Sequence, residues 1–272
     1  MSTTITAPRP SAHLTTGGIL RSEWIKLRSV RSTIWSYGII VVVSVGMALL
    51  LSSTIDFGGQ TPPPEAHQIL ALQTATFGIY MGQLIVAVLG VLVISGEYAT
   101  GMIRSTLTAV PKRIPALAAK TFVLFVATFL LGLVSTFGAL LVALPILAGK
   151  GIEVDLTALA GNLVLASVYL ALVAVFALGL GSILRSSAGG IAAALGVILL
   201  LPTIFQVVAG LTGAQWAIDM MPYLFSTAGT GMFTPTIEGA EGLLQWQSAL
   251  VVVAWAAVSL VGGALLLKRR DA

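Results

Sequence analysis

Cysteine is absent from the 272-residue chain, and histidine occurs only twice. Without thiols the protein can form no disulfide bond, no cysteine-ligated metal site and no cysteine nucleophile. His13 belongs to a polar leader and His67 to a loop beyond the first apolar run, so a membrane crossed by that run would separate them. We therefore expect neither a metal site nor another cofactor.

Charged residues are also scarce. They make up 9% of the chain, against 57% hydrophobic residues, and the mean hydropathy is +1.01. In a typical soluble domain about 25% of the residues are charged. A chain this apolar cannot cover a water-facing surface, so the composition predicts a membrane protein.

Long apolar runs determine the expected fold. A helix needs about 20 apolar residues, each rising about 1.5 Å, to cross a hydrocarbon core of about 30 Å. Six runs meet this length, so residues 18–272 are expected to form a single all-α integral membrane domain with six transmembrane helices. The expected spans cover about residues 34–53, 74–95, 121–148, 160–184, 187–210 and 248–267.

Basic residues cluster on one side of these spans. An even number of spans puts both termini on the same side, and that side holds 13 of the 14 lysines and arginines, with Lys150 as the exception. Basic loops stay in the cytoplasm, so both termini are expected there. The net charge of +4 therefore indicates orientation and contact with anionic membrane lipids. No basic region of domain size is present to predict binding to nucleic acid.

The residues before the first span divide into two parts. Residues 1–17 are rich in Thr, Ser, Pro and Ala and are expected to be disordered. In residues 18–33 apolar side chains recur at helical spacing among basic ones, which predicts an amphipathic helix on the inner membrane surface. Its expected interfacial residues are Leu20, Arg21, Trp24, Lys26, Leu27 and Arg28. The alternative is that these bases only flank the first span.

The fifth apolar run is too long for one span. Residues 186–218 carry no charge, and Pro202 can kink the helix in its outer half. The apolar segment that follows, residues 211–235, predicts one or two short external helices that dip into the outer membrane interface. A plain loop folded over the bundle is the alternative.

No Asp, Glu, Lys, Arg or His lies near the middle of an expected span. Proton-coupled carriers, ion pumps and intramembrane hydrolases generally place ionisable groups there. No zinc-protease, serine-hydrolase or phosphate-loop motif is present either, so the chain is not expected to be an enzyme. The amide side chains inside the spans are Gln83, Asn162 and Gln206. We expect each of them to hydrogen-bond a neighbouring helix.

One charged segment, residues 96–120, interrupts the apolar pattern between spans two and three. Glu97 follows span two, apolar residues then recur on one helical face, and Pro111 can end the helix. The residues on that apolar face are Ile103, Leu107 and Val110. The pattern predicts a short helix over about residues 100–111, parallel to the membrane and joined to two spans. An ordinary basic loop is the alternative.

The order of residues in this segment resembles that in the permease subunits of type-two ABC exporters, especially permeases of actinobacterial type. The matching positions are Glu97, Gly101, Leu107, Pro111, Arg113 and Lys120. The leader LRSEWIKLRS and the ending LLLKRRDA are similar as well, so the resemblance covers nearly the whole chain after residue 17. Met102 stands where family members often carry Thr, which leaves the start of the helix open.

This resemblance implies a transport function. Residues 100–111 would be a coupling helix seated in a groove on a separate ABC ATPase subunit, and residues 18–33 would be an interfacial connecting helix. The implied coupling residues are Glu97, Gly101, Ile103, Arg104, Leu107, Val110, Pro111 and Arg113. A base such as Arg104, or a residue of the ATPase, would hold Glu97.

The resemblance also implies an assembly. Two permeases, identical or different, would enclose one path through the bacterial plasma membrane, above two ATPases. Closure of the ATPases on ATP would open the path outward for an exported substrate that the sequence does not identify. Two other classes of protein stay open at this point: a non-transporting membrane interaction or assembly scaffold, and a membrane-embedded enzyme. The lack of buried acids, histidine and cysteine argues against the enzyme.

Overall fold

The structure is a computed structural model that describes residues 15–55, 62–110, 112–235 and 242–269. Most of the expected disordered tail therefore lies outside the described residues, as does Pro111. The first helix, α1 (Thr16–Ser29), begins two residues before the expected boundary because the Thr15 hydroxyl accepts a 3.1 Å hydrogen bond from the Gly18 N–H and caps it.

The described residues contain helices and no strand, and six of the helices are long and apolar enough to cross a membrane. They are α2 (Arg31–Thr54), α3 (Pro64–Ala99), α5 (Ile114–Gly149), α6 (Leu156–Leu184), the run formed by α7 (Ser187–Leu195), η1 (Gly196–Leu200) and α8 (Leu201–Thr212), and α11 (Gln245–Arg269). The expected all-α class and the six spans are thus confirmed. Several of these helices extend beyond the hydrocarbon length, most of all α3 and α5 with 36 residues each.

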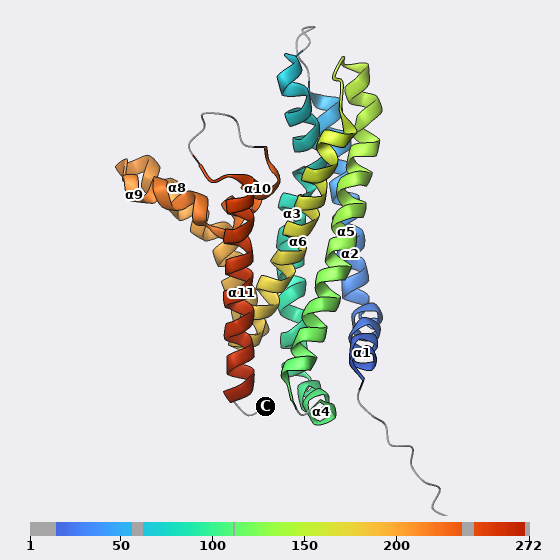
Figure 1. Cartoon of the computed structure of the whole chain (residues 1–272), viewed down its shortest axis with the longest axis vertical. Helices are drawn as coiled ribbons and strands as arrows, with labels where there is room; N and C mark the ends of the chain where they lie inside the picture. The colour runs from blue at the N-terminus through green and yellow to red at the C-terminus, as the bar shows by residue number, and fades with distance from the viewer. Residues whose placement is uncertain (1–14, 56–61, 111, 236–241, 270–272) are drawn as a thin grey trace, which may run out of the picture.

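Helix α6 lies at the centre of the bundle and packs against α3, α5 and α11 (Figure 1). The most apolar stretch of α6 is 72% buried, against 11% for that of Ser187–Thr212. Close approach of α3 to α6 depends on Gly90, where an added Cβ would lie 2.5 Å from the Ala174 carbonyl oxygen. This glycine therefore lets the second span pack closely inside the bundle.

Two of the three amide side chains expected inside the spans bond to neighbouring helices. Gln83 accepts a hydrogen bond from the buried Tyr169 hydroxyl of α6, and Asn162 accepts one at 3.5 Å from Gln245 of α11. The third, Gln206, is exposed on α8. The expectation fails there because α8 leaves the bundle.

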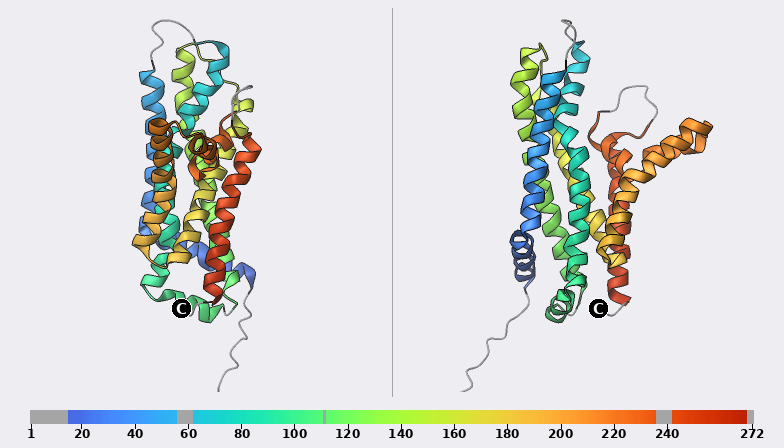
Figure 2. Two further views of the ribbon diagram at one scale, coloured as in Figure 1. Left: turned by 90° about the vertical axis from the view of Figure 1, so that its left-hand side faces the viewer. Right: turned by 180° about the vertical axis from the view of Figure 1, so that it is seen from behind.

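The departure of α8 begins at a π-helical turn, η1, which ends two residues before Pro202. Proline has no N–H, and its ring clashes with the carbonyl four residues earlier, which belongs to Ile198. The Ser226 hydroxyl donates a 2.9 Å hydrogen bond to that carbonyl instead. Beyond this turn α8 diverges from the other helices (Figures 1 and 2), and it exposes the apolar side chains of Ile204, Val207 and Leu211.

Short helices do precede the last span: α9 (Gln215–Met220), the 3₁₀ turn η2 (Met221–Tyr223) and α10 (Phe225–Phe233). They were expected to dip into the outer membrane interface, but α10 packs into the protein interior. Phe225 and Phe233 are fully buried, with ring centroids 6.0 and 6.1 Å from that of Tyr169. Burial of these rings among α6 and α11 removes more apolar area from water than an interfacial position would.

Helices α1 and α4 (Met102–Ala109) both lie across the bundle axis at one end of the molecule (Figures 1 and 2). Helix α11 ends close to them. We call this the basic end, because it carries Lys26, Arg104, Lys112, Arg113, Lys120, Arg185 and Lys268. The opposite, far end carries the end of α2, the start of α3 and the connection from α5 to α6. The charged segment singled out in the sequence therefore lies at an end of the bundle and not along its side.

Candidate functional site

The connection from α3 to α4 depends on one glycine. Gly101 has φ +72°, a left-handed conformation that glycine adopts without the steric cost other residues pay. The chain then turns directly into α4, which covers 102–109 and is shorter than the expected 100–111. Helix α5 follows after Arg113, so the α4 segment is tied to a long helix at each end.

Four charged side chains meet where α1, α3 and α5 come together at the basic end. The Lys120 ammonium donates to Glu23 Oε2 at 2.6 Å and to Glu97 Oε1 at 2.8 Å. The Lys26 ammonium donates to Glu23 Oε1 at 2.7 Å and to Glu97 Oε1 at 3.0 Å. We call these four residues the charge cluster; it holds two acids and two bases, so its formal charge is zero.

A contact from the charge cluster reaches α4. The Lys26 ammonium lies 3.3 Å from the Thr106 hydroxyl oxygen, which can accept a hydrogen bond from it. One side chain of α1 therefore bridges the end of α3 and the middle of α4. Through Lys120 the same network includes the second turn of α5, so displacement of α4 would disturb polar contacts of three other helices.

The charge cluster is withdrawn from water. The side chains of Glu23, Glu97 and Lys120 are 4%, 3% and 5% exposed, and Lys26 is 30% exposed. Charges buried this far persist only when they are paired. Burial of Lys26 opposes its charged form, but the hydrogen bonds and charges of Glu23 and Glu97 outweigh it and raise the pKa of this ammonium above its usual 10.5.

Glu97 is therefore held by lysines of α1 and α5, and not by Arg104, which is exposed on α4. The expected basic partner of Glu97 is thus present within the chain, but it is Lys26 and Lys120 and not Arg104. The role of Glu23 was missed in the sequence, where its contacts with Lys120 cross 97 positions. One signal was available: Glu23 is the only acid between the N-terminus and the end of the first span, in a segment otherwise rich in bases.

The interfacial residues expected on α1 fall into two groups. Trp24 is 39% exposed, and Arg21 and Arg28 are exposed as well, so these side chains face outward. Lys26 and Leu27 are half-buried, and Leu27 packs against the main apolar core. The expected Leu20 is half-buried too. Helix α1 thus buries one side against α5 and presents the other outward, as an amphipathic helix does.

The expected apolar face of α4 turns partly inward. Ile103 is 5% exposed and belongs to the main core, and Val110 is 9% exposed. The side chains of α4 that remain exposed are Met102, Arg104, Ser105, Thr108 and Ala109. Leu107 lies within α4, but its side chain is outside the described part of the structure.

Arg113 of the charged segment and Arg185 at the end of α6 both bond to the last helix. Arg113 donates from Nη1 to the Leu267 carbonyl at 2.9 Å, and Arg185 donates from Nη2 to the Leu266 carbonyl at 3.4 Å. These carbonyls belong to the C-terminal turn of α11, where cations are favoured by the helix dipole. The start of α5 and the end of α6 are therefore both linked to α11.

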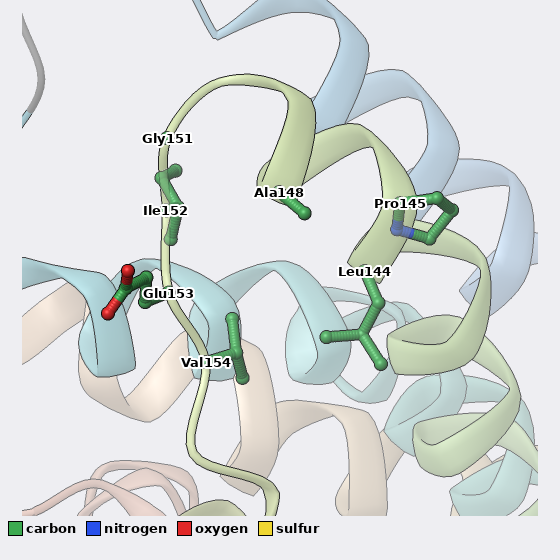
Figure 3. A pocket seen from close by; sticks show the side chains of 7 residues that line it. All are labelled: Leu144, Pro145, Ala148, Gly151, Ile152, Glu153 and Val154. Carbon is green, nitrogen blue, oxygen red and sulfur yellow. The ribbon is translucent and has the colours of Figure 1, made fainter.

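The far end of the molecule offers no comparable constellation among the residues described. A hollow of about 590 Å³ lies beside the connection from α5 to α6, and Glu153 is the one polar side chain among the seven residues that line it. Figure 3 shows its carboxylate directed away from Pro145 and Leu144. In the described ranges, no group of three or more His, Asp or Glu side chains could hold a metal ion.

Comparison with known families identifies the architecture. A model of the family described as ABC-2 family transporter protein matches residues 19–199, which begin within α1 and end within the π-helical turn. That is two-thirds of the chain, and it includes the charge cluster and α4.

The chain belongs to the ABC-2 transporter family. Members of this family are membrane components and not the catalytic ones, so this ABC-2 protein is a multi-pass transmembrane permease. Membership also implies, in general, a partner ATPase subunit. No curated protein matches the chain.

Proposed function

We propose that this ABC-2 permease is the membrane subunit of an ATP-driven exporter and that α4 transmits the movement of a separate ATPase subunit to the spans. The observation that carries the proposal is the charge cluster, because its charged hydrogen bonds join α1, α3 and α5 and its Lys26 ammonium also lies 3.3 Å from the Thr106 hydroxyl of α4. Charge-assisted hydrogen bonds are roughly twice as strong as neutral ones. A load on α4 would therefore move these helices together.

Each expected coupling residue has a part in this proposal. Ile103 and Val110 seat α4 on its own bundle, and Gly101 provides the turn into it. Met102, Arg104, Ser105 and Thr108 form the surface that would enter a groove on the ATPase. Glu97 and Arg113 anchor the two ends of the segment. Contact of Leu107 with the ATPase, and the helix stop at Pro111, stay predictions.

The proposal includes an orientation and an assembly. The basic end faces the cytoplasm, in accordance with the distribution of bases, and two permeases stand above two ATPases in the bacterial plasma membrane. The apolar side chains exposed on α8 support a contact of this helix with lipid or with the second permease. We retain the actinobacterial type as part of the proposal on the basis of the leader and ending sequences.

The decisive experiment measures ATPase binding. The permease is purified with its ATPase, and Arg104→Glu is compared with Arg269→Glu, a matched charge reversal on an exposed residue of α11 at the same end of the molecule. Coupling energies between sites are typically 1–3 kcal/mol, or about 5- to 150-fold. We expect Arg104→Glu to lower ATPase association at least about fivefold within that range, and Arg269→Glu to leave it near wild type.

Transport in cells completes the test. Export should fall with Arg104→Glu although the variant reaches the membrane in normal amounts. If both reversals behave alike, α4 is not the coupling surface. If no ATPase co-purifies with the wild-type chain, the scaffold alternative replaces the proposed exporter.

A further inference from the structure

At the far end of the molecule, His67 joins the start of α3 to the connection between α5 and α6. It lies in the first turn of α3 and is only 9% exposed. The backbone N–H of Glu153, in that connection, donates a 3.1 Å hydrogen bond to the Nδ1 of the ring. The Nε2 lies 3.0 Å from the carbonyl oxygen of Pro62, just before α3. One imidazole therefore links segments that are 86 positions apart in the sequence.

These two contacts fix the protonation state of the ring. A carbonyl oxygen only accepts, so the Nε2 carries a hydrogen, and a ring nitrogen that accepts from an N–H carries none. The imidazole of His67 is therefore neutral in this arrangement. A second proton would place an N–H of the ring against the N–H of Glu153, and two donors form no hydrogen bond. Loss of the acceptor from one group and lack of one for the other are costly where the ring is buried.

The connection that this bond holds is short. Residues 150–155 are not helical, and Gly151 turns the chain with φ +77° (Figure 3). Ile152 anchors the connection from within, because its side chain is 1% exposed and belongs to the apolar cluster at this end. The next residue, Glu153, carries the bond to His67. Loss of that bond would therefore loosen the connection locally and leave the anchor of Ile152 in place.

We propose that His67 is an acid-sensitive latch. The neutral ring holds the connection between α5 and α6 against the start of α3, and protonation releases it. Imidazole ordinarily titrates near pH 6.5, so the latch is closed at pH 8 and opens as the pH falls to 5. That the acid acts from outside the cell rests on the proposed function, which places the far end there; the latch itself does not.

The charged groups near the latch are otherwise engaged or directed into water. The side chains of Glu153 and Asp155 are exposed, and the Asp155 carboxylate caps the N-terminus of α6. The Lys150 ammonium donates to two backbone carbonyls at the end of α2. Within the described ranges, the ring of His67 bonds to Pro62 and Glu153 and to none of these side chains. Glu65 precedes His67 by two positions, and its side chain is outside the described part of the structure.

The test measures hydrogen exchange in the purified permease in nanodiscs, without an ATPase. Mass spectrometry follows the peptide that covers residues 150–155, and its exchange is expressed relative to that of an unfolded peptide at the same pH. This ratio, the protection factor, removes the ordinary effect of pH on exchange and reports local opening. Protection of the Glu153 amide should be about tenfold or more lower at pH 5 than at pH 8. The amides of α4, at the opposite end, are the internal control and should be equally protected at both.

Four variants identify the group that senses acid. His67→Asn keeps an acceptor at the same distance from the backbone as Nδ1 but gains no charge, so protection should be similar at both pH values. His67→Ala offers no acceptor, so protection should be low at both. Glu153→Gln and Glu65→Gln remove the neighbouring carboxylates but keep the ring and the Glu153 backbone, and each should respond to acid like wild type.

Three results would overturn the latch: equal protection of the wild-type connection at pH 8 and pH 5, a wild-type acid response in His67→Asn, or high protection in His67→Ala at pH 8. Loss of the acid response in Glu153→Gln or Glu65→Gln would also overturn it, because a carboxylate would then be the sensor. Neither an ATPase nor the orientation in the membrane enters the measurement. Failure of the latch therefore leaves the proposed coupling role of α4 untouched, and failure of that role leaves the latch untouched.

Discussion

The buried position of Lys120 makes its replacement by methionine a direct test of the charge cluster. Methionine keeps an unbranched chain of similar length but removes the ammonium that donates to both Glu23 and Glu97. Lys26 is then the only base left for two carboxylates that are 4% and 3% exposed. The variant therefore leaves an uncompensated negative charge inside the junction of α1, α3 and α5.

The magnitude follows from the burial of the cluster. Removal of one partner of a buried ion pair costs about 3–5 kcal/mol, because the remaining charge has lost its water and its counter-charge. A charge pair at the surface would cost only about 0–1 kcal/mol. We expect Lys120→Met to fall near the lower end of the buried range, since Lys26 still contacts both carboxylates and is itself 30% exposed.

The assay is reversible unfolding of the purified permease in detergent, in which the free energy of unfolding is compared with that of wild type. Lys268→Met is the matched control, because Lys268 is exposed at the same end of the molecule, and surface substitutions usually change stability by less than about 0.5 kcal/mol. In the double variant Lys120→Met with Glu23→Gln, one acid and one base are both absent. Its charge balance should restore part of the lost stability.

The reasoning would be refuted in either of two ways. Lys120→Met could unfold with the same free energy as Lys268→Met, which would show that the cluster is not buried and paired in the membrane-embedded protein. Alternatively, the double variant could be less stable than the sum of the two single changes, which would show that charge balance is not what holds the helices together.

The remaining predictions concern topology and packing. Because the chain has no native cysteine, a single cysteine at Glu153 should react with an impermeant maleimide in intact cells, whereas one at Arg104 should not; the reverse pattern would invert the proposed orientation. Ser226→Ala should lower the free energy of unfolding by about 1 kcal/mol, because the Ile198 carbonyl loses its donor; an unchanged value would mean that another group satisfies it. Gly90→Ala should lower the free energy of unfolding by about 1–3 kcal/mol, because its Cβ would contact the α6 backbone. An alanine introduced on the exposed face of α2 should lower it little. Equal losses in the two variants would contradict the close approach of α3 to α6.

The sequence by itself determined the class of protein and the number of spans. A transmembrane helix satisfies its backbone hydrogen bonds within one segment, so the length and composition of each apolar run were sufficient to predict it. A short helix was also predictable, although over about residues 100–111 and not 102–109, because helical spacing depends on neighbouring residues. So was the bend at Pro202, since proline acts on the turn directly before it.

Only the tertiary structure decided how these helices use their side chains. Glu23 pairs with Lys120 across 97 positions, and Lys26 with Glu97 across 71. The local sequence marks Glu23 as a lone acid in a basic segment, but it does not indicate which distant base the carboxylate meets. The inward face of Ile103 and the departure of α8 from the bundle likewise depend on which helices stand beside them. Helix formation is a property of a segment, whereas burial and charge pairing are properties of the space between segments.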